Sequence, residues 1–163
     1  MPDICNTMNA ITYGFATTAA DFEKGKKLFE EYVQSLGVDL SFQDFSKELS
    51  TIDEQYNHPK GALLLAHAEG KAIGCAGIRQ LDEEVAELKR MYIRGEYRGY
   101  GIGVHLLEQS LQKAKELGYK KIRLDTLKTM EKAQALYRSF GFYEIPSYRF
   151  NPLEGTIYME KAL

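Results

Sequence analysis

Residues 96–105 read EYRGYGIGVH, and the interpretation of the whole chain starts from this stretch. Glycine occupies every second position, at Gly99, Gly101 and Gly103, and Arg98 stands directly in front of them. An apolar pattern with helical spacing follows at once, so the stretch opens a predicted helix. Glycine weakens a helix start unless its conformational freedom is used. The spacing therefore indicates a backbone that lies close to a ligand.

The chemistry of a helix start predicts that this ligand is an anion. The first turn offers unpaired N–H groups and a partial positive charge, which together suit phosphate. Arg98 adds a planar cation with several donors. The dinucleotide fingerprint G-x-G-x-x-G fails, because Val104 and Leu106 occupy its sixth position in the two possible frames. The stretch fits R-x-x-G-x-G instead, with Arg98, Gly101 and Gly103.

Hydrophobic periodicity on both sides of the stretch predicts an α/β fold with a mixed, mostly antiparallel central sheet and helices on both faces. The predicted strands are 11–17, 61–68, 72–80, 85–93, 120–126, 142–148 and 155–163, and the predicted helices are 21–37, 42–52, 101–117 and 130–140. The three strands before the glycine-rich stretch form an antiparallel meander. A right-handed crossover then places 85–93 parallel to 120–126. Asp21, Ser41 and Thr129 are the expected N-terminal caps of three helices.

Length and composition limit the classes of protein. The 163 residues, 44% hydrophobic and 27% charged, fit one globular domain over 1–163. A net charge of −2 argues against a general nucleic-acid binder, and no apolar run is long enough to cross a membrane. Cys5 and Cys75 cannot form a disulfide framework and have no partner at zinc spacing. We therefore expect a cytoplasmic protein with reduced thiols and no metal site.

Two motifs and the order of elements resemble a known family. R-x-x-G-x-G after the strand LKRMYI (88–93) resembles the acyl-CoA pyrophosphate loop of the GCN5-related N-acetyltransferases, the GNAT superfamily. ALYRSFGF (135–142) resembles the second signature of that family, a helix that carries a Tyr and ends in Gly-Phe before a strand. The order of predicted elements matches along most of the chain. The resemblance implies an N-acetyltransferase that uses acetyl-CoA as co-substrate and binds no metal.

The resemblance also implies where acetyl-CoA binds. The pyrophosphate is assigned, largely through backbone N–H groups, to Arg98, Gly99, Tyr100, Gly101, Ile102 and Gly103. The pantetheine arm pairs like an extra strand with the backbone of Met91, Tyr92 and Ile93, where the strand parts from its parallel neighbour in this family. The side chains of these three residues are equally well explained as buried core.

A base and an acid are the catalytic groups that the resemblance implies. An alkyl ammonium must lose a proton before it attacks a thioester. Glu87 occupies the position of the base in some branches of the family, and its alternative is a salt bridge with Lys89, Arg123 or another cation. Tyr137, four residues before Gly141, occupies the position of the acid that protonates the leaving thiolate. Its alternative is a core aromatic.

The acceptor carries no recognisable motif in this sequence. The family places the region 145–156 near the acceptor, so Tyr148, Arg149 and Asn151 are candidates to face it. The region 21–57 is rich in Asp and Glu, which suits a cationic acceptor or simply forms a solvated surface.

One segment departs from the pattern of the family. Many members carry an Asn seven residues before the helix Tyr, and Met130 stands there in this chain. The segment LDTLKTM (124–130) must therefore have another role, and Thr126 is a candidate polar contact. LDTL (124–127), YRFNP (148–152) and the final strand also resemble one subgroup of small bacterial members.

Three functional classes fit these patterns. The first is an enzyme that moves an acetyl group directly to a primary amine in a ternary complex, with acetyl-CoA and the amine acceptor as its partners. The second is a non-catalytic acyl-CoA sensor on the same fold, and the third is another kind of nucleotide-binding domain. A covalent intermediate at Cys75 is not expected, because this residue lies inside a predicted strand. A homodimer is a further prediction.

Overall fold

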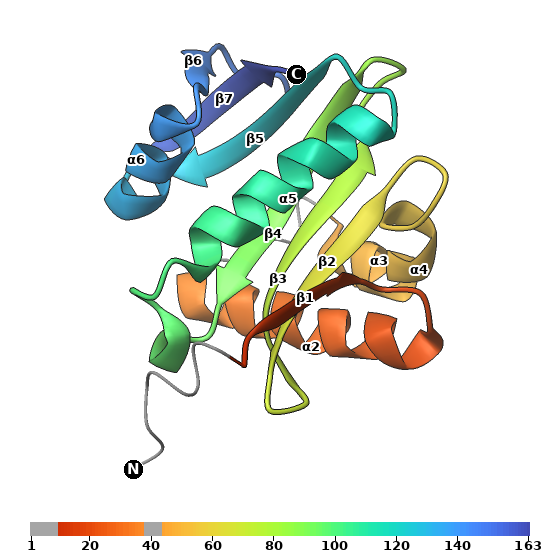
Figure 1. Cartoon of the computed structure of the whole chain (residues 1–163). Coiled ribbons are helices and arrows are strands. Elements are labelled where there is room, and N and C mark those ends of the chain that lie inside the picture. Colours follow the sequence, from red (N-terminus) through yellow and green to blue (C-terminus); the bar gives the residue numbers. More distant parts are fainter. Residues whose placement is uncertain (1–9, 38–43) are drawn as a thin grey trace.

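The computed structural model describes residues 10–37 and 44–163, and these build a seven-stranded sheet with the order β1-β2-β3-β4-β5-β7-β6 (Figure 1). The strands are β1 (Thr12–Phe15), β2 (Ala62–Ala68), β3 (Lys71–Gln80), β4 (Val85–Ile93), β5 (Lys121–Leu127), β6 (Tyr143–Ile145) and β7 (Thr156–Ala162). The helices are α2 (Ala19–Leu36), α3 (Phe45–Ser50), α4 (Ile52–Gln55), the 3-10 helix η2 (Gly95–Tyr97), α5 (Ile102–Glu116) and α6 (Glu131–Ser139). Neighbouring strands are antiparallel except β4 and β5. The predicted sheet, with its meander and its one parallel pair, is confirmed.

The helix caps differ from those expected. Thr18, in extended conformation, is the N-cap of α2, and its hydroxyl accepts from the backbone N–H of Asp21 at 3.1 Å. Asp21 lies in the first turn and accepts in return from Thr18 N at 3.2 Å. The prediction of Asp21 as the cap was therefore wrong, because the two side chains form a capping box. Ser41 lies outside the described residues.

The start of α6 also departs from the prediction. Its N-cap is Met130, which makes no side-chain cap hydrogen bond, so Thr129 is not the cap. The physical reason lies in the helix itself. Gln134 Nε2 donates to the carbonyl oxygens of Leu127 and Lys128, at 2.8 and 3.0 Å, and this holds the preceding residues in a turn.

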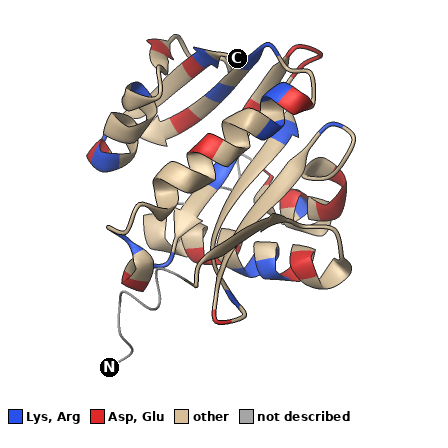
Figure 2. Cartoon of the chain, viewed as in Figure 1, with Lys and Arg blue, Asp and Glu red and all other residues tan. Residues whose placement is uncertain are grey.

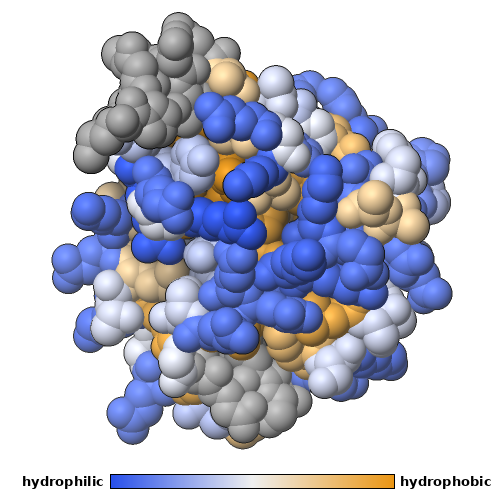
Figure 3. Space-filling view, turned by 90° about the horizontal axis from the view of Figure 1, so that it is seen from below, coloured by the Kyte–Doolittle hydropathy of each residue, from blue (hydrophilic) through white to orange (hydrophobic). Residues whose placement is uncertain are grey.

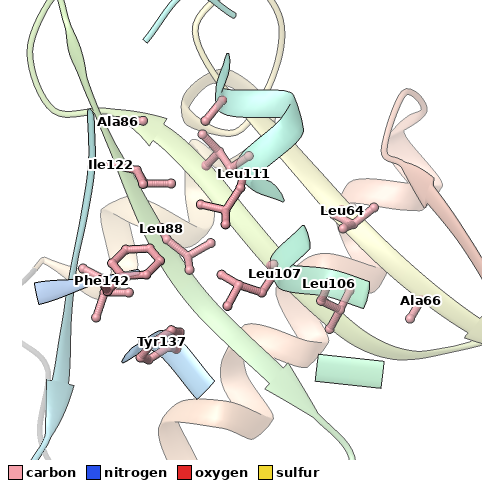
Figure 4. Packing of buried hydrophobic residues seen from close by; sticks show 14 of the residues in the cluster. Leu64, Ala66, Ala86, Leu88, Leu106, Leu107, Leu111, Ile122, Tyr137 and Phe142 are labelled. Carbon is pink, nitrogen blue, oxygen red and sulfur yellow. The ribbon is translucent and has the colours of Figure 1, made fainter. Parts of the chain in front are cut away.

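Two hydrophobic clusters lie on opposite faces of the sheet. α5 covers one face, at the front of Figure 1, through the side chains predicted from its periodicity: Ile102, Leu106, Leu107, Leu111 and Ala114. Leu107 and Leu111 lie over the sheet on the side of Leu88 and Ile122, and Leu106 lies toward Ala66 (Figure 4). α2 and α4 cover the other face. Cys75 is buried in that second cluster, which confirms its interpretation as core, whereas Cys5 lies outside the described residues.

The surface carries both signs of charge in close alternation. Lys and Arg are interspersed with Asp and Glu along the helices and strands (Figure 2). Seen from below, hydrophilic side chains cover most of the face, and hydrophobic surface shows in the gaps between them (Figure 3). Among the described residues, none of the helices combines the length and the apolar character needed to cross a membrane.

β4 and β5 separate after a short parallel ladder. Residues 85–87 pair with residues 121–123, and the parallel ladder ends there. β5 then continues along β7 to Leu127, while the second half of β4 continues along β3. The two strands diverge visibly in Figure 1. Within the described part of the chain, the edge of β4 that faces β5 is therefore open over residues 88–93.

Candidate functional site

The glycine-rich stretch connects the open end of β4 to α5. Gly99 and Gly101 have φ angles of 86° and 78°, which disfavour any residue with a Cβ. A Cβ placed on either one would meet no atom within 4 Å, so both glycines face open space. Gly103 differs, because its Cβ would lie 3.4 Å from Ile93 and 3.6 Å from Leu136. Gly99 and Gly101 shape the loop, whereas a Cβ at Gly103 would make ordinary van der Waals contacts.

The start of α5 presents backbone rather than side chains. Its N-cap is Gly101, which has no side chain to bond the N–H groups of the first turn. The side chain of Ile102 is 2% exposed and belongs to the core, so this residue offers only its backbone to the loop. Such an uncapped helix start is a favourable site for an anion.

Arg98 lies across the end of β4. Its Nε donates to the carbonyl oxygen of Ile93 at 2.9 Å, and its guanidinium lies 5.7 Å from the centre of the Tyr92 ring. The Nη groups make no hydrogen bond to any residue that the structure describes. The Arg98 side chain is thus held beside the glycine loop by its Nε hydrogen bond, which leaves its two Nη groups as further donors.

Met91, Tyr92 and Ile93 form the open part of β4. Tyr92 pairs with Cys75 and Ile93 with Gly74, which uses the edge of β4 that faces β3. The side chains of Met91 and Ile93 pack against the α5 cluster, and Tyr92 packs against the other cluster. Their side chains are partly buried against the two clusters, close to the alternative interpretation of core, and on the opposite backbone edge the carbonyl oxygen of Ile93 is already bonded to Arg98 Nε.

A β-bulge interrupts β4 within its open edge, just before Met91. Arg90 has a φ of 57°, and the register shifts between Cys75 and Gly77 of β3. A bulge adds a residue to one strand and so re-aims the side chains around it. Lys89 and Arg90, adjacent in sequence, are consequently both buried, 3% and 7% exposed, and both act on Glu48 of α3.

Glu87 lies where β4 parts from β5 and is fully buried. Arg79 donates from Nε to Oε1 at 2.9 Å, and its Nη2 lies 2.9 Å from the same oxygen. The Tyr148 hydroxyl donates to Oε2 at 2.7 Å, and Arg149 forms an ion pair with that oxygen. The salt bridge that the sequence left open is therefore formed, with other partners than those named. The role of Glu87 as a base stays a prediction.

The surroundings keep Glu87 ionised. Burial by itself raises the pKa of this carboxyl, but the cations of Lys89 and Arg79 outweigh it, and the pKa lies below its ordinary value. Arg123, the other partner that the sequence suggested, bonds Glu160 of β7 at 2.7 Å instead. That suggestion was wrong because β7 lies on the other side of β5 and supplies the carboxylate from there.

The loop after β6 folds back over Glu87. β6 ends at Ile145 rather than at residue 148, since Tyr148 and Arg149 turn to bind Glu87. The Tyr148 ring also packs edge-on against Tyr158, with ring centres 5.1 Å apart. The structure thus brings both residues to the face of the sheet that carries Glu87. Whether they face an acceptor stays a prediction.

Tyr137 lies on the opposite face of the sheet, under α6. It is 7% exposed and packs against Phe142, with ring centres 5.7 Å apart (Figure 4). Its hydroxyl makes no hydrogen bond to a described residue. Burial raises the pKa of Tyr137, so the hydroxyl keeps its proton at neutral pH. The packing fits a core aromatic and the protonated state fits an acid, so the catalytic role stays a prediction.

The region 21–57 is not only a solvated surface. Asp53 and Glu54 are exposed, as expected, but Glu48 is 2% exposed. Arg90 donates to it twice, from Nε at 3.1 Å and from Nη2 at 2.9 Å, and the Tyr56 hydroxyl donates at 3.0 Å. Burial raises the pKa of Glu48, but the hydrogen bonds and charge of Arg90 bring it below its ordinary value. This pair fixes α3 to β4.

Sequence reasoning did not single out Asp125 of β5. A cavity of about 30 Å³ lies beside it in the gap between the two diverging strands. Its walls include Tyr32, Leu36, Arg90, Asp125, Met130 and Asn151. Asp125 Oδ2 is buried and has no hydrogen-bond partner. One signal was available: a carboxylate inside a predicted strand, between the buried residues Leu124 and Thr126.

Titration of Lys89 is expected to change stability at alkaline pH. Burial, then the nearby Arg90 cation, lowers the pKa of Lys89 to about 8 in the folded protein, against about 10.4 in an unfolded chain. Between these values the unfolded chain binds more protons at Lys89, so the contribution of this residue to the free energy of unfolding rises with pH from about 8 to about 10, against an opposite contribution from the buried Cys75 thiol, whose pKa burial raises. Urea unfolding at steps of pH measures this rise, and Lys89→Met should abolish it. Equal slopes in both proteins would contradict the assignment.

The profile of the Acetyltransferase (GNAT) family matches residues 26–142, well over half of the sequence. The chain belongs to the GNAT family. Its sequence is 39% identical to an uncharacterized N-acetyltransferase of Schizosaccharomyces pombe over 141 residues, covering 85% of this chain and 86% of the relative.

Solved GNAT structures share the fold. A GNAT acetyltransferase of Staphylococcus aureus superposes with a TM-score of 0.75 at 24% identity, covering 94% of this chain and 99% of that one. A GNAT acetyltransferase of Elizabethkingia anophelis, solved with acetyl-CoA bound, gives 0.62 at 24% identity, covering 95% and 99%. The predicted family and fold are confirmed. The protein is an acyltransferase of the N-acetyltransferase type. GNAT relatives come from eukaryotes and bacteria, so the bacterial subgroup is not singled out.

Proposed function

We propose that the protein moves the acetyl group of acetyl-CoA directly to a primary amine in a ternary complex. The observation that carries the proposal is the open edge of β4, which runs into the glycine loop and the uncapped start of α5. The acetyl-CoA bound to a structural neighbour supports the choice of co-substrate. A homodimer and a cytoplasmic location stay predictions.

Two parts of the chain hold acetyl-CoA in this proposal. The loop formed by Arg98, Gly99, Tyr100, Gly101, Ile102 and Gly103 binds the pyrophosphate, with backbone N–H groups and the outward donors of Arg98. The backbone of Met91, Tyr92 and Ile93 pairs with the amides of the pantetheine arm. This route is supported by side chains that pack, partly buried, against the two clusters rather than along the backbone edge. On that edge Arg98 Nε already bonds the carbonyl oxygen of Ile93, so the arm pairs there with the remaining backbone groups.

The transfer itself forms one bond and breaks one. The amine nitrogen attacks the thioester carbon, a backbone N–H on the open part of β4 stabilises the oxyanion, and the carbon–sulfur bond breaks. Glu87 accepts the amine proton through water, which its ionised state supports. Tyr137 gives its proton to the thiolate, which its neutral state supports. The two groups stand on opposite faces of the sheet, on either side of the gap.

Titration calorimetry with acetyl-CoA, followed by a thiol-release assay over a panel of amines, tests this function. Saturable binding and thiol release that depends on an amine are the expected results. Failure of acetyl-CoA to bind would remove the proposal. Binding without thiol release from any amine would favour the non-catalytic sensor instead, and in that case Tyr137→Phe should leave acetyl-CoA affinity unchanged.

A further inference from the structure

Asp125 has a carboxylate oxygen that the protein itself does not satisfy. The residue lies in the middle of β5, where its backbone pairs with Tyr158 of β7. Oδ2 is buried without a hydrogen-bond partner, and no ion pair joins Asp125 to another described residue. A buried polar atom without a partner costs free energy, so native proteins keep few of them. The exceptions that persist are good candidates to meet a ligand.

The cavity that Asp125 lines has the size of a small cationic group. At about 30 Å³ it holds one water molecule or one ammonium group. Leu36, Met130 and the Tyr32 ring supply apolar and aromatic wall. An aromatic face attracts a cation, and a carboxylate accepts its hydrogen bonds. The walls thus combine an acceptor of hydrogen bonds with surface for a short alkyl chain.

Two cations act near the cavity. Arg90 gives two hydrogen bonds to Glu48, so that pair contributes little net charge to the cavity. The buried cation of Lys89 acts on Asp125 and offsets part of its charge, but it gives no hydrogen bond to Oδ2. Asp125 is therefore the charge on the cavity wall that a bound cation can neutralise.

We propose that Asp125 binds the ammonium group of the acceptor and so selects small primary alkylamines. This inference rests on the proposed function and deepens it, because it names the substrate class and a binding residue. It also gives the segment LDTLKTM a role, since Asp125 and Met130 of that segment both line the cavity. Binding moves no proton; the bound ammonium then loses one proton to water to become the free amine, and Glu87 accepts the second proton through water during attack.

Titration calorimetry with a cationic probe and a neutral one tests the proposal. The probes are n-butylammonium and 1-butanol, each titrated at pH 7 into the protein with and without CoA. In Asp125→Asn, which keeps the shape of the side chain, the Kd for butylammonium should rise about 10- to 100-fold, as expected for one lost charge-assisted hydrogen bond. Asp53→Asn, an exposed site with the same change of charge, should leave it unaltered.

Three outcomes would overturn the role of Asp125. In the first, wild type and Asp125→Asn bind butylammonium with the same affinity. In the second, the wild type binds butanol as well as butylammonium. In the third, Asp125→Asn loses affinity for acetyl-CoA and keeps its affinity for the amine. The last would assign the carboxylate to the co-substrate. A wild type that binds no acetyl-CoA would instead remove the proposed function, and the titrations without CoA would still decide about Asp125.

Discussion

Replacing Gly101 by Ala is expected to weaken acetyl-CoA binding about 10- to 100-fold, the loss of one or two charge-assisted hydrogen bonds. Gly101 has a φ of 78°, where an Ala costs about 1–2 kcal/mol. The loop either accepts that strain or shifts, and a shift moves the N–H groups at the start of α5. The new methyl group also enters the open space in which the pyrophosphate is proposed to lie. Calorimetric titration of acetyl-CoA measures the effect.

Gly118→Ala is the matched control for this prediction. Gly118 has a φ of 94°, its Cβ would also meet no atom within 4 Å, and it follows the opposite end of the same helix. The two variants therefore carry a similar backbone strain and a similar loss of unfolding free energy. Only Gly101→Ala should lose affinity for acetyl-CoA. If both variants bind acetyl-CoA as the wild type does, the loop is not the pyrophosphate site.

Glu87→Gln is expected to lower kcat by about 10²–10⁴, the usual contribution of a general base, with little change in KM for acetyl-CoA. The variant also leaves Arg79 and Arg149 without their buried counter-charge, so the free energy of unfolding should fall by up to about 3–5 kcal/mol. Turnover is measured with the best amine from the thiol-release panel, and stability by urea unfolding.

Glu160→Gln separates catalysis from the loss of an ion pair. Glu160 is 5% exposed, pairs with Arg123 and accepts a hydrogen bond from Tyr143, so its surroundings resemble those of Glu87. This control should lose stability and keep kcat. A Glu87→Gln variant with kcat within about tenfold of wild type would leave Glu87 with the salt-bridge role alone.

The pH profile adds an independent check on Glu87. Because its surroundings hold the pKa of this carboxyl below the ordinary value of about 4.3, the folded enzyme should keep the base ionised down to that pH. Any acid limb of kcat that disappears in Glu87→Gln should therefore lie below pH of about 4.3. A limb near neutral pH that persists in the variant would belong to another group.

The local features of the fold could be predicted because each depends on a few neighbouring residues. β4 has the predicted bounds, and α5 differs from its prediction by one residue at each end. The alternation of apolar and polar residues in strands, the helical periodicity and the positions of glycines each involve only a few neighbouring residues. They can therefore be recognised in the sequence. The glycine loop of Gly99 and Gly101 was found for the same reason.

The site between the strands could be predicted only in part, because its contacts join residues far apart in sequence. Glu87 meets Tyr148 and Arg149 across 61 and 62 positions, and Arg90 meets Glu48 across 42. Many acidic and basic residues could form such pairs, and no local pattern selects among them. The N-cap of α2 was also predicted wrongly. Thr18 and Asp21 both lie at this helix start and bond each other, so the sequence does not show which of the two is the cap.

The sequence by itself determined the family, the order of elements and the loop that is proposed to hold a pyrophosphate, because these depend on local spacing. Only the tertiary structure decided that Glu87 is enclosed by Arg79 and by the loop after β6, and that Asp125 keeps an unsatisfied oxygen beside a cavity. Both depend on where β4 and β5 part. That point is set by the packing of the two clusters and by the pairing of β5 with β7, which no single stretch of sequence encodes.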